Sequence, residues 1–493
     1  MEALPQPSVE VPVPETAASE FDLAIIGSGG GAFAAAIRAT NLGQRVVMIE
    51  RGTIGGTCVN TGCVPSKALL AAADAHHVAL DASVRFPGVS TSVGRVDMSG
   101  LVAGKDDLVE WMRSEKYVDL IDEYGWGLRQ GDATFTGSAE DPVLEITDGG
   151  GAVETLRARH YLVATGSAPW APPVDGLSEV DYLTSTTAME LQEVPESMIV
   201  LGGGYVALEQ AQLFARLGSK VTVLARSRLL SGEEPEVSKT LMGVFADEGL
   251  RVVRRAVVES VATDPVTGGV VVAATTRAGR EEYTADRLLV ATGRRAVTER
   301  LGLATVGVAT GEGGEIIVQD TLATSNPRIW AAGDVTGHPE FVYVAAAHGV
   351  TAVENAFNDA GQRIDYTHLP RVTFTSPAVG AVGMTDKQAR EAGIRCECRV
   401  LPLEYVPRAL VNRDTRGFVK IVADADTGRI VGITAVAKEA GDLAAAGVYV
   451  LSAGMTVDQV ATLWCPYLTM AEGLKIAAQS FRTDVSKLSC CAA

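Results

Sequence analysis

One pattern, an apolar strand followed by a glycine-rich turn, a helix and a second strand, occurs twice in this 493-residue chain. The first copy, FDLAIIGSGGGAFAAAIRATNLGQRVVMIE, starts at residue 21, and the second, SMIVLGGGYVALEQAQLFARLGSKVTVLAR, starts at residue 197. Each contains Gly-x-Gly-x-x-Ala, and the shared positions are Gly27, Gly29 and Ala32, then Gly202, Gly204 and Ala207. Such glycines let the backbone approach a pyrophosphate at the positive end of a helix. The duplication predicts an α/β chain that binds two dinucleotides, with the second unit inserted into the first.

The residue that ends the second strand of each copy distinguishes the two sites. Glu50 follows Gly27 by 23 residues, where a carboxylate can accept hydrogen bonds from ribose hydroxyls. At the same distance from Gly202 the chain has Ala225, followed by Arg226 and Arg228. Two guanidinium groups in place of a carboxylate suit a 2′-phosphate, although arginines in a loop can also serve only to solvate it. The pattern favours NADPH over NADH at the second site.

Two cysteines follow the first copy, in the segment GGTCVNTGCVPSKALLAAAD. Cys58 and Cys63 are five residues apart, and Pro65 opens an alanine-rich helix directly behind Cys63. The dipole at a helix N-terminus stabilises a thiolate and lowers the pKa of the thiol. Metal ligation by this pair alone is the alternative, but it needs further ligands, and no Cys or His lies close in sequence. The segment therefore predicts a reactive thiol pair.

The motif GGTCVNTGCVPSK, the two glycine fingerprints and IWAAGDVT around Asp334 resemble the pyridine nucleotide–disulfide oxidoreductase family. The resemblance covers residues 21–493. It implies FAD in the first unit, NADPH in the second and Cys58–Cys63 as a redox-active disulfide next to the flavin. It also implies a fold of two nested Rossmann-like domains and a C-terminal α+β domain that forms a homodimer.

The resemblance further implies a division of the chain into domains. A leader over residues 1–20, rich in Pro and Glu, is expected to be disordered. The expected segments are an FAD-binding domain over 21–162, an NADPH-binding domain over 163–292, a second FAD-binding or central segment over 293–364, and a dimerisation domain over 365–493 with a Cys-Cys tail.

Site residues follow from the resemblance position by position. Lys67 would lie by the flavin and pair with Glu209. Tyr205 would gate the nicotinamide site, although a packed aromatic residue in the first turn of a helix is an alternative reading. The residues expected to line the FAD are Gly52, Thr57, Ala133 and Val342, with Asp334 on its ribityl chain.

The C-terminal region departs from the disulfide-reducing members of that family. Those members carry His-Pro-Thr-x-x-Glu, whose histidine protonates the departing thiolate. This chain reads WCPYLTMAEGLK, with Glu472 in place, Tyr467 at the histidine position and no histidine after His368. A phenol with a pKa of about 10 is a poor proton donor at pH 7. The sequence therefore argues against turnover of lipoamide or glutathione.

The chain ends in KLSCCAA, with Cys490 and Cys491 adjacent. Thiolates prefer soft cations, and a metal that leaves as the neutral element needs no proton. The segments PYLTM and EGLK, VPRAL at 406–410 and the final LSCC resemble the mercury-reducing branch of the family. We therefore expect an NADPH-dependent flavoenzyme that reduces Hg(II) to Hg(0). Its tail would capture Hg(II) and pass the ion to Cys58 and Cys63.

The route to the buried thiols would be lined by Tyr205 and Tyr467, although Tyr467 can equally be simple filler. Many relatives add an N-terminal metallochaperone-like domain with Cys-x-x-Cys, whereas residues 1–20 lack cysteine. Hg(II) is therefore expected to arrive on small thiols or on the tail. Cys396 and Cys398 could bind metal, but an exposed strand pair without other ligands is more often incidental to function. Cys465 can lie near the route or serve as a small core residue.

Charge excludes some classes of partner. A formal net charge of −18 repels nucleic acid and anionic membrane, and the absence of a positive start or a long apolar span predicts a cytoplasmic protein. Two rival functions remain: a disulfide reductase of this family with an unknown substrate, and a non-catalytic protein that sequesters metal with its thiols. The two nucleotide sites and the Lys67–Glu209 pair argue against the second.

Overall fold

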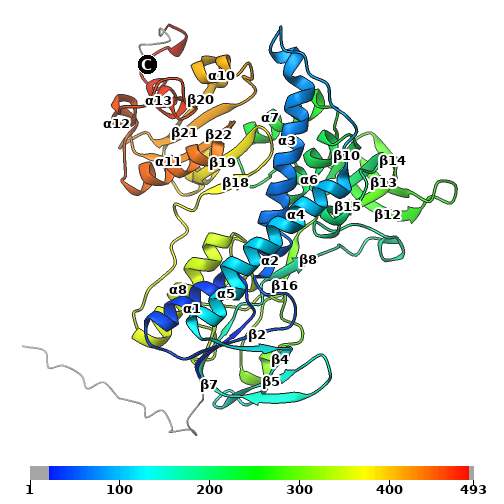
Figure 1. Cartoon of the computed structure of the whole chain (residues 1–493). Coiled ribbons are helices and arrows are strands. Elements are labelled where there is room, and N and C mark those ends of the chain that lie inside the picture. The colour runs from blue at the N-terminus through cyan, green and yellow to red at the C-terminus, as the bar shows by residue number, and fades with distance from the viewer. Residues whose placement is uncertain (1–20, 488–493) are drawn as a thin grey trace, which may run out of the picture. The chain divides into compact units, whose positions relative to one another are not determined.

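The computed structural model describes residues 21–487 (Figure 1). Contacts within the chain define two units. The first comprises Met1–Gly56, Arg113–Ser167 and Arg295–Ile364, and the second comprises Thr57–Met112, Ala168–Arg294 and Asp365–Ala493. The predicted leader and the Cys490–Cys491 tail lie outside the described residues.

The first unit is built on a parallel five-stranded sheet in the order β17-β7-β1-β2-β3. The central strands β1 and β2 are nearly continuous apolar runs, as expected where both faces of a sheet are covered. A three-stranded antiparallel sheet, β4-β5-β6, extends this unit. The strands are β1 (Phe21–Ile26), β2 (Val46–Glu50), β3 (Gly127–Gln130), β4 (Asp132–Gly137), β5 (Pro142–Thr147), β6 (Val153–Leu156), β7 (Ala158–Val163) and β17 (Ile329–Ala331).

Two helices of this unit, α1 (Gly30–Asn41) and α8 (Val342–Asn358), lie side by side in Figure 1. A Cβ on Gly349 would lie only 2.2 Å from the Gly31 carbonyl oxygen. The backbones of α1 and α8 are therefore so close at this point that a side chain at residue 349 would not fit. The alanine-rich face of α1 is buried against the sheet and α8. This close packing holds the N-termini of both helices in place.

The second unit contains the other parallel sheet, in the order β11-β10-β9-β15, and an antiparallel sheet, β12-β13-β14. One apolar core joins α3, α6 and α7 to the parallel sheet. The elements are α3 (Cys63–Arg85), α4 (Met98–Arg113), β9 (Ser197–Leu201), α6 (Tyr205–Arg216), β10 (Lys220–Ala225), α7 (Pro235–Asp247), β11 (Arg251–Arg254), β12 (Val257–Thr263), β13 (Val270–Thr276), β14 (Gly279–Ala285) and β15 (Arg287–Val290).

The C-terminal part of this unit is an antiparallel sheet in the order β18-β19-β22-β21-β20, with helices packed against it. Lys420 on this sheet is buried and forms ion pairs with Glu234 at 2.9 Å and Glu236 at 3.0 Å. The elements are β18 (Arg371–Thr373), β19 (Ala378–Gly383), α9 (Asp386–Glu391), β20 (Cys396–Pro402), α10 (Pro407–Val411), β21 (Phe418–Asp424), β22 (Ile430–Ala437), α11 (Ala440–Ser452), α12 (Val457–Thr462) and α13 (Glu472–Gln479).

Short elements complete the described chain. They are α2 (Gly56–Asn60), η1 (Ser114–Val118), α5 (Asp119–Tyr124), β8 (Ser167–Pro169), η2 (Leu177–Glu179), η3 (Thr187–Glu190), β16 (Arg294–Ala296), η4 (Leu303–Val306), η5 (Gly333–Thr336), η6 (Leu403–Tyr405) and η7 (Val485–Lys487). The predicted fold class is confirmed: two strand–turn–helix units with parallel sheets precede a C-terminal sheet with helices. Among the described residues, no helix has the length and apolar character needed to cross a membrane.

Candidate active site

The first glycine fingerprint forms the turn between β1 and α1. Gly27 has φ +105°, and a Cβ there would lie 2.5 Å from the Ala164 carbonyl oxygen, so only glycine fits. Gly29 is the N-cap of α1, and Ala32 is fully buried. The unpaired N–H groups of the first turn of α1 therefore lie at an unobstructed backbone, which is suited to a phosphate.

Glu50 ends β2 next to this turn. One carboxylate oxygen accepts a hydrogen bond from Ser28 Oγ at 2.6 Å, and the other accepts one from the Gly52 amide at 2.7 Å. At Gly56, a Cβ would lie 2.5 Å from Gly29 Cα, so the loop after β2 contacts the fingerprint. The structure thus brings Glu50 and Gly52 to the N-terminal end of α1.

The remaining residues expected to line the FAD are placed on several elements. Val342 begins α8 and is 40% exposed, and its Cγ2 atom lies 3.0 Å from the position a Cβ on Gly30 would take. Asp334 lies in η5 and accepts a hydrogen bond from Ser167 Oγ at 2.8 Å. Ala133 is buried in the apolar core of β4, and Thr57 lies in α2.

The second fingerprint repeats this geometry between β9 and α6. Gly202 has φ +139°, and a Cβ there would lie 2.3 Å from the Ala291 carbonyl oxygen. Gly204 is the N-cap of α6, Tyr205 is its first residue and Ala207 is fully buried. The second turn therefore offers the same open helix N-terminus as the first.

The two arginines after β10 have different environments. Arg226 is exposed. Arg228 is half-buried, and its Nη2 donates hydrogen bonds to the carbonyl oxygens of Ser231 at 2.7 Å and Glu233 at 2.6 Å. Arg228 therefore holds the loop after β10 in shape, whereas Arg226 presents its charge to solvent at the end of the strand.

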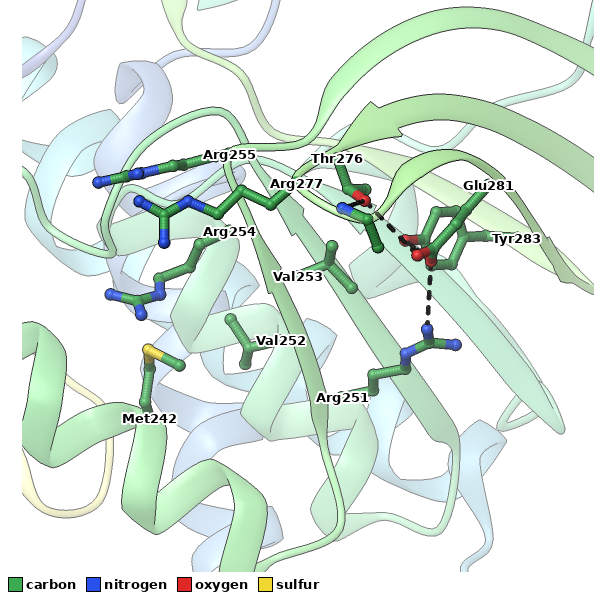
Figure 2. Close-up of a pocket in the computed structure, with 11 residues that line it drawn as sticks. Met242, Arg251, Val252, Val253, Arg254, Arg255, Thr276, Arg277, Glu281 and Tyr283 are labelled. Atoms are coloured by element: carbon green, nitrogen blue, oxygen red, sulfur yellow. Dashed lines mark hydrogen bonds and ion pairs between the residues drawn. The ribbon is translucent and has the colours of Figure 1, made fainter.

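A third arginine, which the sequence alone did not predict, lies at this edge. Arg254 ends β11, and its Cα is the register partner of Ala225 in the parallel sheet. It lines a pocket of about 300 Å³ with Arg228 and Lys239, and a second pocket of about 440 Å³. In Figure 2, Arg254, Arg255 and Arg277 extend to one side of the second pocket, away from Glu281. The RVVRR run at 251–255 was the available signal, but its position depends on strand order.

The two cysteines lie at the junction of two helices in the second unit. The expectation that both thiols are buried was wrong: Cys58 is half-buried in α2, and Cys63 is exposed as the first residue of α3. A hydrogen bond between the two thiols lowers the pKa of Cys63 to about 7 and raises that of Cys58. The positive charge of Lys67 lowers both pKa values. Cys63 is thus the thiolate of the pair near neutral pH, with Cys58 as its hydrogen-bond donor.

Lys67 lies one turn after Cys63 on α3. Its Nζ atom lies 2.8 Å from Glu209 Oε2, so the expected ion pair is present. Glu209, on α6, is only 5% exposed, and its other oxygen accepts a hydrogen bond from the Phe374 amide at 2.9 Å. The Lys67 ammonium also lies 4.5 Å from the centre of the Phe374 ring. Both carboxylate oxygens of Glu209 therefore have a partner. The ion pair holds the Lys67 ammonium in place, and its positive charge stabilises the Cys63 thiolate.

We expect the Cys58→Ala substitution to raise the pKa of Cys63 from about 7 towards an ordinary thiol value, because the hydrogen bond from Cys58 is the largest cause of the shift. The thiolate fraction at pH 7 would fall roughly tenfold. Alkylation of the Cys63 peptide with iodoacetamide, followed by mass spectrometry across pH, measures this. Cys58→Ser keeps a donor and should give an intermediate pKa; identical profiles for all three proteins would contradict the assignment.

Tyr467 and Glu472 lie in the C-terminal part of the second unit. Tyr467 is 48% exposed, in a segment that also exposes Trp464 completely. Glu472 begins α13 and is 4% exposed, and its Oε2 has no hydrogen-bond partner among the described residues. Burial raises the pKa of the Glu472 carboxyl. The exposed aromatic surface around Tyr467 is of the kind that a second subunit covers.

One expectation about the other cysteines was wrong. Cys396 and Cys398 are half-buried, and a carboxylate oxygen of Asp386 lies within 4.8 Å of both sulfur atoms, so a further potential ligand is present. Local sequence could not show this, because Asp386 lies on α9 and the cysteines on β20. Cys465 is half-buried, and burial and the Glu472 charge raise the pKa of its thiol.

Comparison with known families gives two matches. The family described as "Pyridine nucleotide-disulphide oxidoreductase" matches residues 21–349, which contain both fingerprints and the thiol pair. The description "Pyridine nucleotide-disulphide oxidoreductase, dimerisation domain" matches residues 369–478, which contain the C-terminal sheet. Together the two matches account for most of the described chain.

Curated relatives and solved structures are similar along nearly the whole length. A "Mercuric reductase" of Streptomyces lividans is 58% identical over 472 residues, which are 96% of this chain and 98% of the relative. A "Mercuric reductase" of Staphylococcus aureus is 44% identical over 96% of this chain and 84% of the relative. The Cu(II) complex of the HOCl-induced flavoprotein disulfide reductase RclA from Escherichia coli has a TM-score of 0.84 at 27% identity, covering 94% of this chain and 100% of that one. LpdA from Mycobacterium tuberculosis has a TM-score of 0.83 at 26% identity, over 94% and 100% of the two chains.

Proposed function

This chain belongs to the pyridine nucleotide-disulphide oxidoreductase family, and on that basis we propose that it is an enzyme that reduces Hg(II) to Hg(0) with electrons from NADPH. The observation that carries the proposal is the 58% identity to a mercuric reductase across almost the full length of both chains. The thiol pair at the start of α3 supplies ligands that a soft cation prefers. The dimerisation domain supports a homodimer.

The first fingerprint fits FAD. At Gly27 and Gly56 a side chain would collide with the backbone, which leaves a bare turn for a pyrophosphate at the α1 N-terminus. Gly27, Gly29 and Ala32 would hold the pyrophosphate, and the fixed Glu50 carboxylate would accept hydrogen bonds from the adenosine ribose. When bound, FAD supplies two-electron transfer between NADPH and the thiols or their metal ion. The other residues that we propose to line the FAD are Gly52, Thr57, Ala133, Asp334 and Val342.

The second fingerprint fits NADPH. Gly202, Gly204 and Ala207 would hold its pyrophosphate, and the exposed Arg226 lies where a 2′-phosphate is expected. Arg228 shapes the loop, and Arg254 adds a second positive charge at the carboxyl edge of the sheet. Tyr205, first in α6, is proposed to gate the nicotinamide site.

We expect NADPH to exceed NADH clearly in kcat/KM. Arg226→Ala with Arg254→Ala should lower kcat/KM for NADPH by about fivefold to 150-fold, as loss of charge-assisted contacts worth about 1–3 kcal/mol predicts. The value for NADH should change little. Arg251→Ala is the matched control, since Arg251 starts the same strand but forms an ion pair with Glu281 at 3.6 Å. Equal use of both nucleotides by the unmodified enzyme would refute the 2′-phosphate assignment.

The thiol pair is proposed to hold the ion during reduction. Cys63, with a pKa of about 7, is available as a thiolate, and Cys58 joins it by losing its proton to a departing small thiolate. Two electrons enter the S–Hg–S unit, both sulfur–mercury bonds break, and Hg(0) leaves with two thiolates on the protein. No proton is required for this departure, so Tyr467 can stand where disulfide-reducing members have a histidine. Lys67 and Glu209 fix the charge next to the thiolate.

Delivery of the ion is proposed to use Cys490 and Cys491, which lie outside the described residues. The tail would take Hg(II) from small thiols and pass it on by thiol exchange, along a route lined by Tyr205 and Tyr467, with Glu472 supporting the segment that carries Tyr467. A cytoplasmic location supplies both NADPH and such thiols. We also propose that the chain divides into FAD-binding segments at 21–162 and 293–364, an NADPH-binding domain at 163–292 and a dimerisation domain at 365–493.

Hg(II)-dependent oxidation of NADPH under excess thiol, with detection of mercury vapour, tests the proposal. A panel of disulfides in place of Hg(II) tests the rival disulfide reductase. If only a disulfide supports oxidation, the proposed substrate is wrong. A purified protein that is not yellow, or whose colour is not bleached by NADPH, would support metal sequestration instead.

A further inference from the structure

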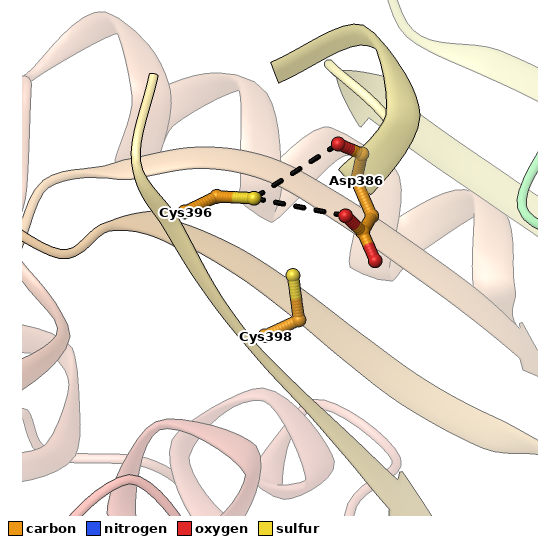
Figure 3. A group of neighbouring side chains, drawn as sticks. All are labelled: Asp386, Cys396 and Cys398. Carbon is orange, nitrogen blue, oxygen red and sulfur yellow. Dashed lines mark hydrogen bonds between the residues drawn. The ribbon is translucent and has the colours of Figure 1, made fainter. Parts of the chain in front are cut away.

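A second group of thiols lies on the C-terminal sheet, away from the elements that carry Cys58 and Cys63. Cys396 and Cys398 occupy alternate positions of the edge strand β20, so their side chains leave the same face of the strand. That face meets Asp386, the first residue of α9 (Figure 3). Cys396 Sγ lies 3.6 Å from Asp386 Oδ1 and 3.9 Å from the Asp386 carbonyl oxygen.

The spacing of these atoms fits a single ion. Both sulfur atoms and one carboxylate oxygen lie within 4.8 Å of one another. A thiolate binds a soft divalent ion at about 2.3 Å. Two sulfur atoms within 4.8 Å of each other can therefore lie on opposite sides of one ion. The Cα atoms of alternate strand residues are about 6.7 Å apart, which is the upper limit for a disulfide. The geometry therefore favours an ion between the sulfurs over a bond between them.

The surrounding charges also fit an ion held by two thiolates. Asp386 pairs with Arg390 at 2.7 Å, and Lys420 lies 4.0 Å from its other oxygen. The Asp386 amide donates a hydrogen bond to Glu234, which itself pairs with Lys420 at 2.9 Å. A divalent cation that replaces two thiol protons adds no net charge to this set. All three ligand residues are half-buried, so an ion can reach them without unfolding the sheet.

We propose that Cys396, Cys398 and Asp386 form a second binding site for a soft divalent cation. Hg(II) is the ion that it binds, and the two sulfur atoms are the main donors. Binding is an exchange without oxidation or reduction. A bis-thiolate complex RS–Hg–SR gives its ion to the two cysteines, two sulfur–mercury bonds break and two form, and the two cysteine protons leave on the released RSH molecules. The site does not require that the chain reduce mercury.

Equilibrium dialysis of the FAD-bound protein against inorganic Hg(II) with competing cysteine measures the site directly. The background protein carries serine at Cys58, Cys63, Cys490 and Cys491, which removes the other thiol pairs. We expect this protein to bind one Hg(II) per chain. Adding Cys396→Ser and Cys398→Ser should abolish that binding, whereas adding Cys465→Ser, a half-buried cysteine outside the cluster, should leave it intact. Equal binding with and without the Cys396–Cys398 pair, or loss only with Cys465→Ser, would overturn the proposal.

A second measurement uses the unmodified enzyme and so does not depend on variants that fold. Bound Hg(II) should protect the Cys396–Cys398 peptide from alkylation by iodoacetamide, by at least about tenfold in rate. Zn(II) in place of Hg(II) tests whether the Asp386 oxygen selects a harder ion as well. In the dialysis experiment, by contrast, Asp386→Asn should weaken Hg(II) binding by less than loss of either sulfur does. Alkylation at the same rate with and without Hg(II) would show that the two sulfurs do not bind the ion.

Discussion

Cys63→Ala should lose Hg(II) reduction almost completely, by roughly three orders of magnitude or more, while the protein stays yellow. Cys63, at the start of α3, is the thiol of the pair whose pKa is lowered. With Cys63 removed, Cys58 alone cannot supply the two sulfur ligands that hold Hg(II) for reduction. The residues proposed to bind the flavin, Gly27, Gly29 and Glu50, are left unchanged by the substitution. The measurements are mercury vapour release and the ratio of flavin to protein absorbance.

Matched variants separate the thiol chemistry from general damage. Cys58→Ala should be as inactive as Cys63→Ala, although it leaves the better nucleophile in place, because both sulfurs are needed to bind the ion. Cys465→Ser should keep the full rate, since that half-buried thiol lies outside the pair. Substantial Hg(0) release from Cys63→Ala would mean that another pair, such as the C-terminal one, presents the ion for reduction.

Mixed dimers should recover about half of the normal activity from two inactive parents, because one of their two sites is complete. One parent lacks Cys58 and Cys63, and the other lacks Cys490 and Cys491, with excess thiol competing for the ion. Recovery is expected if the tail of one subunit serves the thiol pair of its partner. The exposed segment with Tyr467 and Trp464, in the dimerisation domain, is where a partner subunit would lie.

Two affinity tags on different subunits isolate the mixed dimer, and each parent homodimer serves as the control. Wild-type subunits carrying the same tags set the full rate. A verified mixed dimer that stays inactive would show that delivery occurs within one subunit, since then neither site has both an intact tail and an intact pair. That outcome would leave the reduction of Hg(II) itself unaffected.

Much of the site could be predicted because the residues that define it lie close together in the sequence. The positive φ of Gly27 and Gly202 and the closeness of the next strand admit only glycine, so the fingerprint is visible in the residues themselves. The position of Glu50 could be predicted because it lies 23 residues after Gly27, at the end of the second strand. Cys63 is a helix N-terminal residue because Pro65 and an alanine-rich run follow it.

What the sequence determined by itself is therefore the two nucleotide turns, the thiol pair and the absence of the usual proton donor, all of which depend on neighbours within one or two turns of chain. Only the tertiary structure placed Arg254 next to Ala225, and Asp386 next to Cys396 and Cys398. It also showed that Arg228 is bound to its own loop while Arg226 is exposed. These relations depend on strand order, register and helix packing, and apolar periodicity is compatible with several such arrangements.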